Sequence, residues 1–138
     1  MATVGAANCE FFRADAYNVA DVVPRPVDFV LLANTFHGVP DKVRLARAVA
    51  AVLRPAGRAA IVNWHRRPRE ETVVLGQPRG PKSEMRMTPK QVQAVIEPAA
   101  LRHARTLELP PYHYGMVFEK PAAQRIPESV GGLRPGSK

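Results

Sequence analysis

Residues 27 to 65 read VDFVLLANTFHGVPDKVRLARAVAAVLRPAGRAAIVNWH, and this stretch decides the fold. Its opening, Val27–Ala33, is a nearly continuous apolar run, which is typical of a strand buried on both faces of a parallel sheet. Asp41 can cap a helix, because apolar residues then recur at helical spacing until Gly57 ends the pattern. The apolar run at residues 58–64 predicts a second buried strand.

The order strand, helix, strand predicts a parallel pair of strands, because parallel neighbours are joined by such a crossover. Open α/β sheets bind their ligands beyond the carboxyl ends of the strands. We therefore expect the functional loops to be residues 34–40, whose sequence is NTFHGVP, and the segment that follows Trp64.

This unit resembles the second half of class I S-adenosylmethionine (SAM)-dependent methyltransferases, in particular the small-molecule group often labelled type 11. The matching pieces are residues 27–37, Asp41-Lys42 and residues 53–58, where family members usually carry glycine at the position of Ala56. The resemblance extends over about residues 8 to 120. It implies an α/β, Rossmann-like partial methyltransferase sheet with parallel strands and a C-terminal antiparallel pair, formed here by two extended runs around Pro110-Pro111.

The resemblance further implies SAM as the cofactor and methyl transfer to a small molecule as the reaction. The family holds SAM with a G-x-G-x-G turn after its first strand, and none of the nine glycines of this chain forms such a turn. We therefore expect residues 1–120 to be a partial domain that starts inside the fold, with a strand at residues 9–14. Activity of this chain alone is thus in question, and a non-catalytic truncated remnant or interaction module is the alternative.

By resemblance, Asp15 is the acid that accepts a hydrogen bond from the adenine amino group, and Ala16 offers its backbone N–H to the neighbouring ring nitrogen. The structural alternative is that Asp15 caps the next turn. Asn34, Thr35 and Phe36 stand where the family lines the floor of the cofactor pocket, with a turn-forming or packing role as the alternative for each.

On the acceptor side, His37 is the candidate catalytic base, because an unperturbed pKa near 6.5 suits proton removal from a phenol or enol. The alternative is a structural histidine that bonds to the loop backbone. Trp64 and His65 follow the second strand and should face the pocket rim, where Trp64 would lie against a sulfonium or an aromatic substrate, or else pack in the core. His113 lies in a Tyr-His-Tyr run that lines a substrate pocket or simply packs.

The histidines and the single cysteine do not have metal-ligand spacing, so the sequence predicts no metal site. One cysteine, Cys9, excludes an internal disulfide and fits a reducing compartment. No apolar run has the length of a membrane span, and the amino terminus does not follow the order of a secretory signal. These features favour a cytoplasmic protein without a membrane partner.

The chain is strongly basic, with a formal net charge of +8 from 20 Lys and Arg against 12 Asp and Glu. The basic residues are spread out, apart from a cluster at residues 65–69, and no interleaved aromatics or recognition helix accompany them. The pattern favours solvated arginine-rich faces over a nucleic-acid role, and a basic pocket for an acidic small substrate remains open.

Three further expectations concern the remaining segments. The polar stretch at residues 65–87 has no periodicity, so it is a lid, a binding segment or disordered. Thr88 should cap a helix through a capping box, and residues 121–138 read as a disordered tail. In the resembled fold the first strand lies beside Val27–Ala33, so its absence would expose this edge to self-association or to a partner chain.

Overall fold

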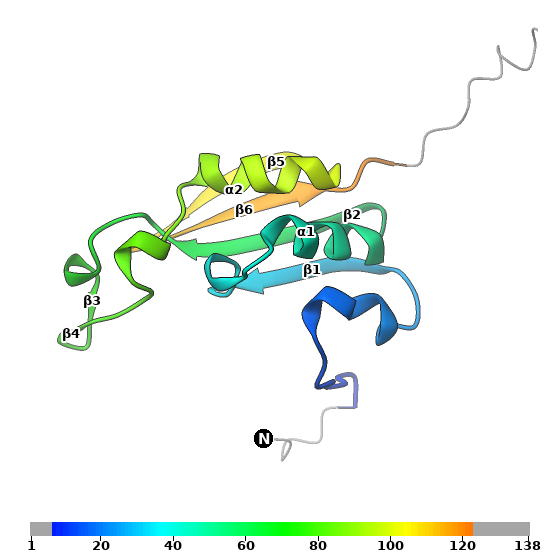
Figure 1. Ribbon diagram of the computed structural model, residues 1–138, viewed down its shortest axis with the longest axis horizontal. Coiled ribbons are helices and arrows are strands. Elements are labelled where there is room, and N and C mark those ends of the chain that lie inside the picture. The colour runs from blue at the N-terminus through cyan, green and yellow to red at the C-terminus, as the bar shows by residue number, and fades with distance from the viewer. Residues whose placement is uncertain (1–6, 123–138) are drawn as a thin grey trace, which may run out of the picture.

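The computed structural model describes residues 7–122, and a four-stranded mixed sheet organises them (Figure 1). Its strands lie in the order β1 (Val27–Ala33), β2 (Leu53–Trp64), β6 (His113–Glu119) and β5 (Arg102–Leu109). β1 is parallel to β2, whereas β6 runs antiparallel to both β2 and β5. The expected α/β architecture, with a parallel pair and a terminal antiparallel pair, is confirmed.

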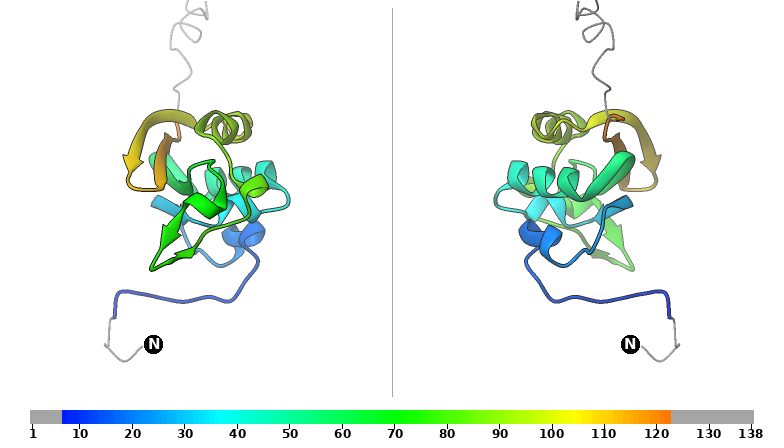
Figure 2. Two further views of the ribbon diagram at one scale, coloured as in Figure 1. Left: turned by 90° about the vertical axis from the view of Figure 1, so that its left-hand side faces the viewer. Right: turned by 90° about the vertical axis from the view of Figure 1, so that its right-hand side faces the viewer.

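Both α-helices cover the same face of the sheet, as Figures 1 and 2 show. They are α1 (Lys42–Val52) and α2 (Pro89–Ile96). The Asp41 carboxylate accepts a hydrogen bond from a backbone N–H in the first turn of α1, at 3.1 Å. At α2, Thr88 and Gln91 form the predicted capping box, with bonds of 3.1 and 2.8 Å. Both helix starts therefore follow from satisfying the free backbone N–H groups at a helix N-terminus.

Short elements fill the connections. They are the 3-10 turns η1 (Ala16–Asp21), η2 (Phe36–Gly38), η3 (Arg69–Glu71), η4 (Ser83–Met85) and η5 (Glu97–Ala99), and the two-residue strands β3 (Val73–Val74) and β4 (Gln77–Pro78). From η3 to η4 these elements form one excursion between β2 and α2. The stretch at residues 65–87 therefore contains two 3-10 turns and a short two-stranded sheet.

The hydrophobic core lies between the sheet and the two helices. Its fully buried members come from α1, α2 and the inward face of the strands, and include Leu45, Val49, Ile61, Val92, Ile96, Tyr114, Met116 and Phe118. Along β6 the side chains alternate, which places Tyr114, Met116 and Phe118 together on the buried face. This core fixes the carboxyl ends of β1 and β2 relative to the helices.

The strand expected at residues 9–14 is wrong: these residues are exposed and pair with no other strand. A strand needs a neighbour for its backbone hydrogen bonds, and the described chain offers none there. β2 begins at Leu53, before the expected Arg58, because Val27 pairs with Leu53 across an irregularity in the ladder. α2 ends at Ile96, two residues ahead of Pro98.

Two further expectations concern the C-terminal tail and membrane spans. Residues 123–138, which make up most of the predicted disordered tail, lie outside the described residues. Within residues 7–122, neither helix is long and apolar enough to span a membrane.

Candidate functional site

The two predicted functional loops lie side by side at the carboxyl ends of β1 and β2. The Asn34 N–H donates to the Val62 carbonyl at 2.7 Å, so the pairing of the strands continues one residue past β1. The chain then turns into η2, while Trp64 ends β2. The parallel pair thus brings residues 34–37 and 64–65 to one edge of the sheet, as the sequence predicts.

Three residues after β1 have different environments. Asn34 is exposed and has a left-handed backbone with φ of 59°, which asparagine tolerates better than most residues. Thr35 is also exposed, whereas the Phe36 ring is fully buried in the core. The turn-forming role of Asn34 and the packing role of Phe36 are therefore both observed. A ligand at this edge can therefore reach the side chains of Asn34 and Thr35, whereas Phe36 is fully buried.

Asp15 and Ala16 lie at the start of η1. One Asp15 carboxylate oxygen accepts from the Tyr17 N–H at 2.9 Å, which is the turn-capping role named above as the alternative. The Tyr17 hydroxyl accepts from the Asp41 N–H at 3.0 Å, and the Arg44 guanidinium lies 4.3 Å from the Tyr17 ring centroid. These contacts hold the start of η1 against the start of α1, directly after the loop that begins at Asn34.

His37 is half-buried in η2, and its Nδ1 atom is buried without a hydrogen-bond partner among the described residues. Burial, followed by the positive charges of Lys42 and Arg86, lowers the pKa of His37 below 6.5. The imidazole is therefore neutral at neutral pH and has a lone pair that can accept a proton.

His37 also lines a pocket of about 560 Å³, a volume within the range of small-molecule sites. Its wall combines η2, η4 and α2, with Met85, Met87 and Val95 as apolar members and Gln91 as a polar one. Among the described cavities, this pocket is therefore the candidate acceptor site, because the candidate base His37 lines it.

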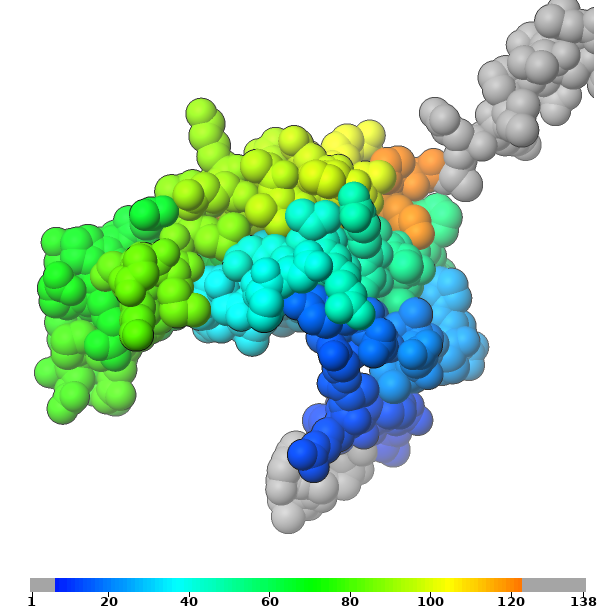
Figure 3. Space-filling model, in the orientation of Figure 1, coloured from blue at the N-terminus to red at the C-terminus, as the bar shows by residue number. Residues whose placement is uncertain are grey.

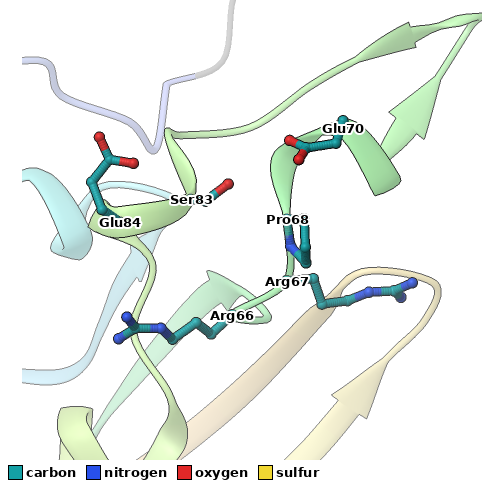
Figure 4. A pocket seen from close by; sticks show the side chains of 6 residues that line it. All are labelled: Arg66, Arg67, Pro68, Glu70, Ser83 and Glu84. Carbon is teal, nitrogen blue, oxygen red and sulfur yellow. The ribbon is translucent and has the colours of Figure 1, made fainter.

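A second pocket of about 490 Å³ adjoins the first, since Arg66 and Glu84 line both. Figure 4 shows Pro68 and Glu70 on one side of it and the η4 residues Ser83 and Glu84 on the other. The excursion at residues 65–87 therefore contributes to the walls of both cavities.

Arg86, which sequence reasoning missed, organises this excursion. Its side chain is buried, at 2% exposure, and its guanidinium donates to the carbonyls of Pro81 and Arg79 at 3.1 and 3.0 Å and to the Thr72 hydroxyl at 3.0 Å. No ion pair to Arg86 is present among the described residues. Burial, then Arg69 and Arg67, lowers its pKa. Its position in a polar stretch looks like a surface arginine, so the sequence has no signal for this role.

Trp64 is enclosed by neighbours from the protein itself. Its ring centroid lies 4.3 Å from that of His113, and the Arg86 guanidinium lies 5.1 Å from the indole centroid. Gly80, with φ of +94°, approaches so closely that a Cβ atom there would lie 2.8 Å from the indole. These contacts give Trp64 a packing role.

The other two predicted substrate residues lie beside Trp64. His65 Nε2 lies 2.8 Å from Glu108 Oε1, and the His65 ring contacts the Tyr114 ring with centroids 5.0 Å apart. The Nε2 atom of His113 is buried without a partner among residues 7–122, and burial, then Arg86 and His65, lowers its pKa. The structure thus groups Trp64, His65 and His113, while Arg86 connects this group electrostatically to His37. The described residues contain no cluster of three metal-ligating side chains.

No protein-family model and no curated protein sequence matches this chain. Among solved structures, it is similar to a SAM-dependent methyltransferase from Aquifex aeolicus, with a TM-score of 0.69 and 24% identity over 85% of this chain and 57% of that one. It is also similar to a putative type 11 methyltransferase from Sulfolobus solfataricus, with a TM-score of 0.58 and 26% identity over 75% and 57% of the two chains.

A third similar structure is the [4+2]-cyclase SpnF, with a TM-score of 0.61 and 12% identity over 83% of this chain and 56% of that one. The chain therefore spans less than two thirds of the length of these neighbours. Its strand arrangement and these similarities show the class I SAM-dependent methyltransferase fold, without the glycine-rich cofactor loop in the residues present.

Proposed function

We propose that this chain supplies the acceptor-side part of a SAM-dependent methyltransferase that acts on a small molecule. The observation that carries the proposal is the neutral His37, which lines a pocket of small-molecule size at the carboxyl ends of two parallel strands. The methyltransferases among the similar structures support the reaction class. The cyclase among them indicates that the fold alone does not fix the reaction, so the site residues must carry the argument.

The described residues fit one portion of SAM. Asp15 is exposed, and so is Ala16, the first residue of η1. Asn34 and Thr35 are exposed just after the end of β1. Such groups suit the hydrogen-bonding edge and hydroxyls of a nucleoside. Among residues 7–122 no glycine-rich turn follows a strand in the way that would let backbone approach the methionine portion. The fit therefore concerns the nucleoside end of the cofactor.

When bound, SAM supplies an electrophilic methyl group for in-line transfer. In the proposed reaction His37 takes the proton of an acceptor hydroxyl, and the neutral state of its imidazole at neutral pH supports this role. Met85, Met87 and Val95 supply an apolar wall against which the acceptor would pack. Orientation of the acceptor supplies the larger part of the rate, since well-aligned encounters are worth ~7–11 kcal/mol.

The proposal is tested by incubating the 138-residue protein with methyl-labelled SAM and a panel of small phenols and enols. Labelled product would show that the chain acts alone, and His37→Gln should then lower the rate of product formation by about a hundredfold or more, the size of a general-base contribution. His103→Gln is the matched control, because His103 bonds to Thr106 on β5 and does not line the pocket.

Calorimetry with SAM separates the alternatives. Heat of binding together with methyl transfer supports the enzyme. No product, together with no heat at high micromolar SAM, would reject independent cofactor binding and favour the alternative, a non-catalytic remnant or interaction module. We also propose a cytoplasmic location, supported by a single exposed cysteine, Cys9, which suits a reducing compartment.

A further inference from the structure

The pocket that His37 lines has more positive than negative charge in its wall. Three cationic side chains line it, Lys42, Arg66 and Arg86, against one carboxylate, that of Glu84. Figure 3 shows how the chain builds this wall, because the segments of η4 and α2 lie against the segment of η2 and the start of α1 on one face of the molecule. An excess of one charge in a pocket attracts a ligand of the opposite charge.

The three cations differ in the hydrogen bonds that they can still offer. Arg86 is buried, and its guanidinium already donates to backbone carbonyls of the excursion, so it contributes charge rather than a contact. Lys42 donates to the Val39 carbonyl at 2.9 Å, which uses one of its three N–H groups. Arg66 is exposed, and its Nη1 atom lies 3.4 Å from Gln91 Oε1. Arg66 and Lys42 therefore have donors for a ligand.

Neither of these two donors is paired with a carboxylate of the protein. Within residues 7–122, no ion pair involves Arg66 or Lys42. Figure 4 shows the Glu84 carboxylate pointing away from the Arg66 guanidinium. The next residue, Arg67, differs in both respects, since it pairs with Glu71 at 3.5 Å and lines the adjoining pocket. An anionic group of a ligand is therefore free to pair with Arg66.

The positive charge of the wall acts at the candidate base. After burial, Lys42 and Arg86 are the causes that lower the pKa of His37, so both charges lie near its ring. The same pocket has apolar members, among them Met85 and Val95. A ligand that matches the whole wall has an apolar body, an anionic group and a hydroxyl.

We propose that the methyl acceptor is a small hydroxy acid, whose carboxylate binds Arg66 and Lys42 while its hydroxyl meets His37. This inference rests on the proposed function, because it names the acceptor class of the same site. The carboxylate only binds, and the hydroxyl is the group that reacts. The planar guanidinium of Arg66 matches a carboxylate in a bidentate arrangement, and Lys42 adds a point charge. A carboxylate suits the pocket better than a phosphate dianion, because Glu84 repels the dianion more strongly.

The test is the binding of para-hydroxybenzoate to the 138-residue protein without SAM, followed by NMR and calorimetry. The uncharged para-hydroxybenzamide, which has nearly the same shape, is the matched ligand. We expect the acid to shift the ring signals of His37 and to bind about tenfold or more tightly than the amide, because the amide lacks the charge-assisted hydrogen bonds.

Substitutions assign this preference to single side chains. Arg66→Gln should remove the preference for the acid, whereas Glu84→Gln should strengthen binding of the acid because it removes the repelling carboxylate. Arg67→Gln is the matched control, since it removes the same charge one residue away from a side chain that is paired with Glu71. The control should leave the preference in place.

Four results would overturn the inference. They are equal affinity for the acid and the amide, a preference that survives Arg66→Gln, the absence of saturable shifts up to about 10 mM acid, and binding of para-hydroxyphenylphosphonate about tenfold more tightly than the acid. The last result would make the ligand a phosphate-like dianion.

The inference and the proposed function fail in different ways. Binding of the acid with the expected preference, but without methylation of any hydroxy acid, would leave the anion site in place and reject the proposed methyl transfer. Methylation of neutral phenols as fast as of hydroxy acids would support the methyl transfer and overturn the acceptor class.

Discussion

At the scale of single residues, the first part of β2 contains a strained alanine. Ala56 has a left-handed backbone with φ of 70°, and its N–H donates to the Lys120 carbonyl at 2.8 Å. At the next residue, a Cβ on Gly57 would lie 2.8 Å from the Arg54 carbonyl oxygen, so that position requires glycine. The left-handed conformation costs an L-residue about 1–2 kcal/mol, which glycine avoids.

Ala56→Gly should therefore stabilise the protein. Relief of the left-handed strain outweighs the greater backbone entropy of glycine, for a net gain of about 0.5–1 kcal/mol in the free energy of unfolding. Urea denaturation measures the change. Ala48→Gly within α1 is the control of opposite sign and should cost about 1 kcal/mol. Destabilisation by both substitutions would contradict the assigned backbone conformation.

The protonation of His37 is a second residue-scale property open to measurement. Because Lys42 is one cause of its lowered pKa, Lys42→Met should raise the NMR titration midpoint of His37 toward 6.5. Lys90→Met removes a lysine that is not among those causes and should leave the midpoint in place. A midpoint that does not respond to Lys42→Met would show that Lys42 does not contribute and that burial and Arg86 account for the lowered pKa.

The same lowered pKa values predict how stability depends on pH. His37 and His113 bind protons less readily in the folded chain than in the unfolded one, because both are partly desolvated. The unfolded state therefore takes up more protons as the pH falls through about 6.5, and the free energy of unfolding decreases. Denaturation curves between pH 8 and pH 5 (about one and a half units either side of 6.5) measure this, and the decrease should shrink in His113→Gln. Unchanged stability over this interval would contradict the burial of both rings.

At the scale of elements, the excursion at residues 65–87 depends on Arg86. Arg86→Met removes the donor to two carbonyls and to the Thr72 hydroxyl, which should cost about 2–3 kcal/mol. Hydrogen exchange should show lost protection in this excursion before any change in β1 or α1. Arg79→Met is the control, because the Arg79 side chain is exposed and makes a single bond of 3.4 Å to Val74. Equal effects of the two substitutions would show that Arg86 does not organise the excursion.

The contrast between predicted and unpredicted elements has a physical cause. The capping residues Asp41 and Thr88 and the alternation in β6 act within a few residues of themselves, so the sequence displays them directly. The expected strand at residues 9–14 depended on a neighbour remote in sequence, and no described strand lies beside it. The burial of Arg86 likewise depends on carbonyls that the chain brings together only after folding.

The candidate site also has features that the sequence predicts and features that only the structure shows. The sequence predicted that the residues after β1 and β2 would meet, because the parallel crossover determines this. It left open whether Asp15, Phe36 and Trp64 have structural roles, and the structure shows a cap, a core ring and an indole packed against His113. Their ligand roles remain predictions, as does the contribution of His65 and His113 to an acceptor site.

At the scale of the whole molecule, the excess of positive charge is dispersed. Several arginines form ion pairs, including Arg54 with Asp28 at 2.8 Å, Arg102 with Glu119 at 2.9 Å and Arg67 with Glu71 at 3.5 Å. Figure 4 shows Arg66 and Arg67, of the densest cluster, extending in different directions. Over the described residues, this arrangement favours a diffuse positive field over the single basic stripe that is typical of a nucleic-acid site.

Binding of the protein to duplex DNA should therefore be weak and independent of sequence. As the salt concentration rises, binding should be lost before about 0.2 M, because each phosphate contact contributes only through counterion release. Salt-gradient elution from immobilised DNA measures it. The double variant Arg66→Gln/Arg67→Gln should shift elution no more than Arg13→Gln/Arg25→Gln, since both remove two charges of the same diffuse field. A much larger shift for the 66/67 pair would identify residues 65–69 as a focused anion-binding surface, and the dispersed-charge interpretation would then be wrong.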